Sequence, residues 1–192
     1  GELCAVDTIQ RGNINTTYKI TFRMMDGRLK SYVAQKINTF VFKKPEEIMS
    51  NIDQVTTHIQ QRYPQELSLH FHHTAEGKNY LCDADGSFWR IMNYVDSDSY
   101  DTSEDPEVIR STGEAFGHFQ NQLADLDGSL LHETIPDFHN TPLRLKAFFA
   151  HVEEDSCGRV QEIPEELDYI HSMEEIVSRL HGMLERGEIP LR

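Results

Sequence analysis

A short run of small and amide side chains near the N-terminus has the composition of a phosphate-binding turn. The run is Gly12-Asn13-Ile14-Asn15-Thr16, and it leads directly into a β-rich segment. Small residues allow tight turns, and a tight turn can direct several backbone N–H groups at one anion. An ordinary polar turn before a strand has a similar composition, so this run alone is weak support for a binding site.

A lysine on the next β-rich segment strengthens that interpretation. The string Val33-Ala34-Gln35-Lys36 follows the pattern Val-Ala-x-Lys of the kinase strand whose lysine contacts the α- and β-phosphates of ATP. A turn, a hairpin and then this lysine follow one another in the small lobe of a kinase. The residues therefore predict a phosphate site formed by the turn and Lys36.

The elements around these residues are those of an α+β fold. Residues 17–24 and 29–36 are predicted to form a hairpin, because Asp26-Gly27 between them suits a tight turn. A helix is predicted from Pro45, where four residues at helical spacing would form one apolar stripe: Ile48, Ile52, Val55 and Ile59. Further strands are predicted at 67–73, 79–82 and 88–95, with a turn at Asp85-Gly86.

The second half of the chain has a helical pattern. It begins after residues 96–107, which contain six acidic side chains and no basic one and are predicted to be a solvated connector. Helices are predicted at 106–126, 142–153 and 164–186. Several aromatic residues have the spacing of core residues: Trp89, Phe116, Phe119, Phe148 and Phe149. These patterns predict a nucleotide-binding small lobe over 1–95, ending in a hinge, and an acidic connector with helices over 96–192.

Four strings of residues resemble N-acetylhexosamine 1-kinases, which belong to the aminoglycoside-phosphotransferase-like family. They lie at 12–18, 35–42, 87–90 and 133–141. The resemblance implies a protein-kinase-like small lobe, with an antiparallel sheet and one helix, followed by the first helices of a helical C-terminal lobe. It also implies ATP- and Mg²⁺-dependent phosphorylation of a hexosamine hydroxyl, at the anomeric position.

The resemblance assigns positions to the nucleotide. It implies that Gly12, Asn13, Ile14, Asn15 and Thr16 cover the phosphates and that Lys36 contacts the α- and β-phosphates. It places the hinge at 91–95, where the backbone of Met92, Asn93 and Tyr94 would bind the adenine edge between apolar walls such as Ile20 and Val33.

The lysine of this pattern usually pairs with an acid on the neighbouring helix. Glu47 and Asp53 are the candidates here, although both lie on the flanks of the apolar stripe. Relatives often have arginine in place of Lys36, so the phosphate contact can differ in detail.

The catalytic residues of this class are not found in the sequence. Phosphoryl transfer needs an Asp that accepts the hydroxyl proton, and then an Asn and a second Asp for the metal. No histidine is followed two residues later by Asp, and in the similar enzymes the catalytic loop follows a segment such as 164–186. We therefore expect the catalytic Asp and the Mg²⁺ ligands beyond Arg192, so that this chain alone is inactive and self-associates through apolar helical surface.

Three other motifs have structural interpretations. The string Asp125-Leu126-Asp127-Gly128 is typical of a helix end and a turn. The pair His132-Glu133, with His139, does not match the H-E-x-x-H spacing of a zinc site. His70 and His72 share a strand face without a third ligand, which indicates a polar strand.

Composition limits the remaining function classes. The 192 residues carry a net charge of −14, which disfavours nucleic acid and anionic membranes as partners. Three cysteines without a C-x-x-C spacing indicate reduced thiols, and no leader or membrane span is recognised, so we expect a cytoplasmic protein. Two alternatives remain: a kinase of this fold for an aminoglycoside, choline-like or amino-alcohol acceptor, and a non-catalytic interaction module derived from a kinase lobe.

Overall fold

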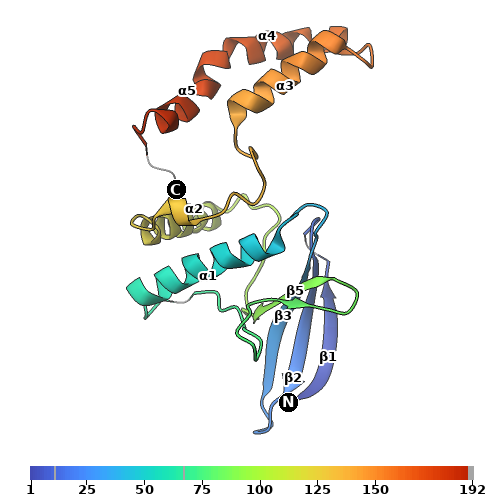
Figure 1. The fold of residues 1–192 in the computed structure, drawn as a ribbon, viewed down its shortest axis with the longest axis vertical. Coiled ribbons are helices and arrows are strands. Elements are labelled where there is room, and N and C mark those ends of the chain that lie inside the picture. The colour runs from blue at the N-terminus through green and yellow to red at the C-terminus, as the bar shows by residue number, and fades with distance from the viewer. Residues whose placement is uncertain (11, 67, 190–192) are drawn as a thin grey trace. The chain divides into compact units, whose positions relative to one another are not determined.

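A five-stranded antiparallel sheet forms the first part of the chain (Figure 1). The structure is a computed structural model that describes residues 1–10, 12–66 and 68–189. The strands lie in the order β1-β2-β3-β5-β4, with these bounds: β1 Glu2–Ile9, β2 Thr16–Arg23, β3 Leu29–Ile37, β4 Leu81–Cys82 and β5 Phe88–Asn93. Together with the helices, this sheet confirms the α+β class.

The predicted hairpin is β2 and β3. Gly27 has φ +82° in the turn between them, a conformation that suits glycine. Strand β1 was not predicted from the sequence, because its string Glu-Leu-Cys-Ala-Val-Asp-Thr-Ile has no clean alternation of apolar and polar residues. It pairs along β2 from Glu2 to Ile9 and forms one edge of the sheet.

Helix α1 (Pro45–Arg62) covers one face of this sheet and forms the core with it. Proline at its first turn, acids in that turn and Arg62 in the last turn all favour this helix. The predicted apolar stripe is shifted by one residue, since Met49, which is fully buried, and Ile59 lie at its centre in place of Ile48. Met49 packs against Ile37 of β3 and Phe71.

The second β region is shorter than predicted. Leu67 lies outside the described residues, and within 68–73 only Phe71 forms a bridge, to Met92 of β5. Residues 74–78 form a tight turn closed by the Thr74 N–H, which donates to the Lys78 carbonyl. The Asn79 side chain donates to the Met49 carbonyl of α1 at 2.7 Å, so this segment ties the helix to the sheet instead of extending β4.

Helix α2 (Pro106–Gln122) begins as predicted after the acidic connector, but its apolar face is not buried. Asp105 caps its first turn by accepting from the Glu107 N–H. Phe116 is 67% exposed and Phe119 is 45% exposed, so the prediction that both are core residues is wrong. The helix is held at its C-terminal end by polar contacts, with His118 and Gln122 both donating to the Glu66 carboxylate.

The chain divides into two compact units, Gly1–Thr134 and a helical unit that begins at Ile135. The division lies well after the boundary expected at residue 96, because polar contacts tie the turn after α2 to α1. The Asn51 side chain bonds both the N–H and the carbonyl of His132, and the Gln54 side chain donates to the Leu130 carbonyl. The sheet, α1 and α2 therefore belong to one unit.

The helical unit contains α3 (Thr141–Glu154), α4 (Pro164–Ser172) and α5 (Glu174–Glu185). The single helix predicted at 164–186 is broken at Met173. The Ser172 hydroxyl donates to the Tyr169 carbonyl, and Glu174 and Glu175 start a new first turn after the break. Phe149 is half-buried and stacks on the His171 ring at 4.4 Å, but no residue described in these three helices is fully buried.

Candidate functional site

The predicted phosphate-binding turn lies beside Lys36. Residues 12–15 connect β1 to β2, and Thr16, the first residue of β2, pairs directly with Lys36 of β3. Gly12 has φ +105°, which a residue with a side chain adopts only with strain. The hairpin register therefore brings the turn and the lysine to the same end of the sheet.

Asn38, just beyond β3, holds the turn in place. Its backbone N–H donates to the Asn15 side chain at 2.8 Å, and its side chain donates to the Ile14 carbonyl at 3.1 Å. These two bonds fix the turn to the strand end two residues from Lys36. Sequence reasoning missed this role, although Asn38 belongs to the quoted string at 35–42.

The Lys36 amine is exposed and lies near an aromatic ring and an acid. Its Nζ is 5.9 Å from the centre of the Trp89 ring, and the Trp89 indole donates to the Asp83 carboxylate at 2.8 Å. The Trp89 bond, first, and then the Ser87 backbone N–H lower the pKa of the Asp83 carboxyl below its ordinary value, and the charge of Lys36 acts in the same direction. The charges of Asp83 and Lys36 therefore attract one another.

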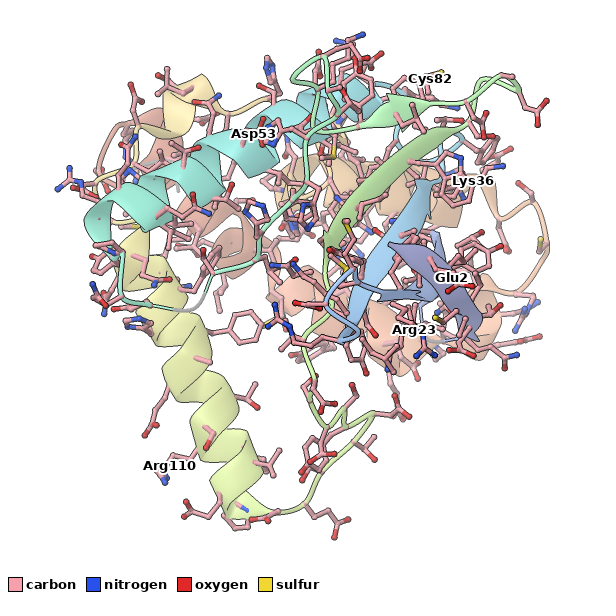
Figure 2. All side chains as sticks on the ribbon, turned by 90° about the horizontal axis from the view of Figure 1, so that it is seen from below. Glu2, Arg23, Lys36, Asp53, Cys82 and Arg110 are labelled. Atoms are coloured by element: carbon pink, nitrogen blue, oxygen red, sulfur yellow. The ribbon has the colours of Figure 1, made fainter. Side chains whose placement is uncertain are left out.

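The predicted pairing of Lys36 with an acid on α1 is not present. Alternation along β3 places Lys36 on the face opposite Ile37, which packs against α1. Glu47 pairs instead with Lys44 at 2.7 Å, and Asp53 with His73 at 3.3 Å. Figure 2 labels Asp53 on α1 and Lys36 on the sheet.

The backbone predicted to bind adenine is largely engaged within the fold. The Asn93 N–H donates to the His70 carbonyl at 3.1 Å, and the Tyr94 N–H donates to the Ser31 carbonyl at 3.3 Å. Met92 pairs with Val33 inside the β3–β5 ladder. In this structure the expected hinge segment is therefore the end of a strand whose donors are already satisfied.

The two apolar walls expected for the base lie on opposite faces of the sheet. Ile20 pairs with Tyr32, whereas Val33 pairs with Lys19. Cross-strand partners share a face and neighbours along a strand do not, so Ile20 and Val33 are directed to opposite sides. They do not enclose one base together.

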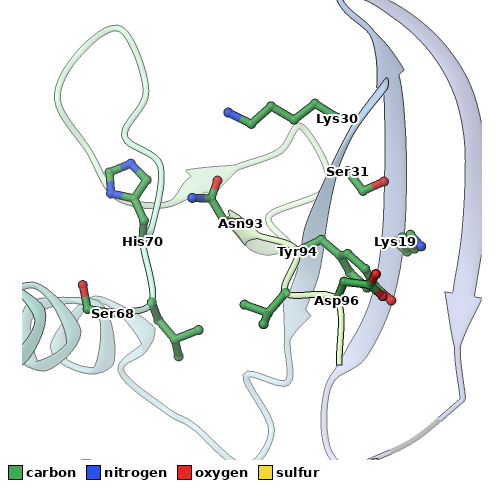
Figure 3. A pocket seen from close by; sticks show the side chains of 10 residues that line it. Lys19, Lys30, Ser31, Ser68, His70, Asn93, Tyr94 and Asp96 are labelled. Atoms are coloured by element: carbon green, nitrogen blue, oxygen red, sulfur yellow. The ribbon is translucent and has the colours of Figure 1, made fainter. Parts of the chain in front are cut away.

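A cavity of about 540 Å³ lies beside the end of β5 (Figure 3). Lys19 and Lys30 line it, and each lysine lies over a ring, Lys19 at 4.0 Å from the Tyr94 centre and Lys30 at 5.1 Å from the Tyr32 centre. Its other polar walls are His70, Asn93 and Asp96, among others. The lining is mixed, since Leu69 and Val95 add apolar walls to the two lysines and the acid. Nothing in the sequence pattern indicated that these residues meet.

The acidic motif after α2 is a turn, as predicted. Asp127 accepts from the Ser129 N–H and hydroxyl and caps a single 3-10 turn. Asp125 pairs with Arg62 and His58 of α1. Both carboxylates therefore have structural roles.

The histidines at 70 and 72 lie together without forming a metal centre. Their rings are 4.8 Å apart, and His72 bonds the Asn93 side chain at 2.9 Å. Across the described ranges, no group of three His, Cys, Asp or Glu side chains could hold a metal ion. The three cysteines are free and exposed.

Comparison with known families gives no assignment, since no family model matches this sequence. Within the part of the chain that the structure describes, no helix has the length and apolar character needed to cross a bilayer. The local geometry and the resemblance of the four strings are therefore the basis for a functional proposal.

Proposed function

We propose that this chain is the nucleotide-binding portion of an ATP-dependent sugar kinase, similar to the N-acetylhexosamine 1-kinases of the aminoglycoside-phosphotransferase-like family. The observation that carries the proposal is the clamp by which Asn38 holds the 12–16 turn beside Lys36. A kinase small lobe has the same parts in the same order: a turn over the phosphates, a lysine on the third strand and a helix on the sheet.

The turn and Lys36 have complementary tasks in this proposal. Backbone N–H groups of the turn would approach the phosphates closely, because Gly12 has no side chain and its positive φ opens the backbone. Lys36 would supply a point charge at the α- and β-phosphates. Bound phosphate would then compete with Asp83 for that charge.

The base would lie toward the β5 end of the sheet. Ser31 lies five positions before Lys36 on β3, a span of roughly 17 Å at the rise of an antiparallel strand. The first backbone groups beyond the ladder there are those of Val95 and Asp96, which line the cavity of Figure 3. These groups, rather than the amides of Asn93 and Tyr94, are the ones we assign to the base.

Mg²⁺ would neutralise charge on the triphosphate when bound, but the described residues offer no cluster that fits it. We therefore assign the metal ligands and the Asp that accepts the hydroxyl proton to sequence outside these 192 residues. In this proposal the chain binds ATP without transferring its phosphate. The acceptor, a hexosamine or another small alcohol, would bind largely outside this chain as well.

A non-catalytic interaction module is the second candidate, and the exposed apolar residues favour it. On α2, Ile109 and Phe116 are more than half exposed, as are Ile176 and Leu180 on α5. Apolar surface of this kind is typical of interaction sites. Sedimentation would show concentration-dependent self-association if these faces bind one another, and a monomer at all concentrations would contradict that expectation.

Calorimetric titration with ATP, with and without Mg²⁺, distinguishes the two candidates. The nucleotide proposal expects saturable binding that is lost or weakened at least about tenfold in Lys36→Ala, since a charge-assisted phosphate contact contributes roughly 1.5–3 kcal/mol. Lys78→Ala is the matched control, because it removes an exposed lysine in the 74–78 turn. A folded chain that does not bind ATP, or equal affinities in both variants, would contradict the proposal.

A further inference from the structure

A second cavity, of about 480 Å³, lies between α1, segment 68–71, β5 and α2. Its walls are mainly apolar and include Val55 and Ile59 of α1, Phe71 and Phe119. The volume is within the usual range for small-molecule sites, roughly 300–1,000 Å³. None of the residues assigned to the nucleotide lines this cavity.

One charged side chain, Arg90 of β5, lines the cavity. Its guanidinium lies 5.5 Å from the centre of the Phe71 ring. Two of its N–H groups donate to the Gln35 side-chain oxygen, at 2.9 and 2.6 Å, and the Gln35 amide donates in turn to the Thr17 hydroxyl. Arg90 is therefore held in one orientation by neutral partners.

The charge of Arg90 has no acidic partner in the described contacts. Burial lowers the pKa of this half-buried guanidinium. Glu66 is the acid closest in sequence to the lining segment 68–71, and its carboxylate is already bonded to His118 and Gln122. A guanidinium has five N–H donors, and Gln35 accepts only two of them, so Arg90 can bind a further acceptor.

We propose that this cavity binds a small carboxylate with an apolar body. The carboxylate accepts from Arg90, a pairing for which the guanidinium geometry is well suited. The apolar body packs against Val55, Ile59 and Phe71. The fold itself already desolvates Arg90 by burial, so the ligand's own desolvation is the main electrostatic cost of binding.

Phenylacetate is a suitable probe, and 2-phenylethanol is its neutral counterpart of similar shape. Each titration is followed by calorimetry and by the NMR shifts of Val55 and Ile59. Phenylacetate should bind saturably, and the affinity for 2-phenylethanol should be lower by about tenfold or more. Acetate, which has the charge without the apolar body, should bind more weakly than phenylacetate.

Two variants locate the site. Arg90→Met retains much of the volume and removes the charge, so phenylacetate affinity should fall about tenfold or more while 2-phenylethanol affinity is unchanged. Val55→Trp should fill the cavity and abolish binding of both probes. Arg110→Met is the matched control, because Arg110 is an exposed arginine on α2 that pairs with Glu107 and Glu114.

If Arg90→Met does not fold, Arg90→Lys replaces it as the test variant. It preserves the positive charge and should bind phenylacetate with an affinity between those expected for the wild-type chain and for Arg90→Met. Equal affinity of the wild-type chain for phenylacetate and 2-phenylethanol, absence of binding, or identical affinities in the Arg90 and Arg110 variants would each overturn the proposal. ATP titration reports on Lys36 separately, so either proposal can fail without the other.

Discussion

Strand β3 serves two different faces of the sheet. Ile37 and Gln35 are directed to the face that α1 covers, where Ile37 joins the core and Gln35 holds Arg90. Lys36, between them, is directed to the opposite face, where Trp89 and Asp83 are its neighbours. Packing and the candidate phosphate chemistry are therefore separated by alternation along one strand. Substitutions in the core and in the candidate site can therefore be made independently at adjacent residues of β3.

The largest change in stability is expected for a substitution on the face of the sheet that α1 covers. Met49→Ala should lower the free energy of unfolding by about 2–5 kcal/mol, because Met49 is fully buried between Ile37 and Phe71. Urea unfolding measures the change. Ile48→Ala is the control, since Ile48 is only partly buried. Equal losses in the two variants would mean that the core is not centred on Met49.

The next largest effect is expected for Asn38, whose hydrogen bonds clamp the 12–16 turn beside Lys36. Asn38→Ala removes the bonds to Asn15 and Ile14, each worth roughly 0.5–1.5 kcal/mol. We expect lower stability and faster hydrogen exchange in the 12–16 turn, together with weaker ATP binding. Asn13→Ala, at an exposed position of the same turn, is the control for stability and hydrogen exchange. A variant with normal exchange in the turn would show that Asn38 does not hold it.

Trp89→Phe tests the acid near Lys36. The variant retains an aromatic ring but loses the indole N–H, so the pKa of Asp83 should rise toward 3.8, its ordinary value. Because the pKa of Asp83 is lowered in the folded state, the Asp83 carboxylate stabilises the fold at pH values above 3.8. This stabilisation is lost as the pH falls through the lowered pKa of the folded state. NMR titration of the Asp83 carboxyl measures the shift. An unchanged titration would show that another group sets this pKa.

The smallest effect is expected for Glu47→Gln. Glu47 pairs with the exposed Lys44 rather than with Lys36, and such pairs contribute at most about 1 kcal/mol. The ATP affinity, measured by calorimetry, and the free energy of unfolding, measured in urea, should both be close to those of the wild-type chain. A marked loss of ATP affinity would indicate that Glu47 reaches Lys36 after all.

The local parts of the site were predictable, and its long-range contacts were not. The hairpin at Asp26-Gly27 determines the register, and the register alone places Thr16 opposite Lys36. The face toward which Lys36 is directed could not be deduced, because it depends on which side of the sheet α1 covers. The opposite directions of Ile20 and Val33 do follow from the register, because Ile20 pairs with Tyr32, so the expectation that both enclose one base was avoidable from the hairpin pattern.

The long-range contacts of the fold were also not predictable from the sequence. Helix α2 was predicted from its periodicity, but periodicity does not reveal whether an apolar face has anything to pack against, and Phe116 is exposed. Arg90 belongs to the quoted string at 87–90, but the sequence pattern did not indicate its cavity, which depends on Gln35 from β3 and on residues of α1. Such combinations depend on tertiary packing rather than on sequence pattern.

Mapping ATP onto the chain by amide NMR shifts shows directly whether the 12–16 turn and Lys36 bind its phosphates. We expect shifts on ATP addition to concentrate at residues 12–16, at Lys36 and Asn38, and at Val95 and Asp96 beyond β5. They should be absent from the α3–α5 helices, and Lys36→Ala should remove the shifts at the turn. Shifts confined to other parts of the chain, or none at saturating ATP, would contradict the account.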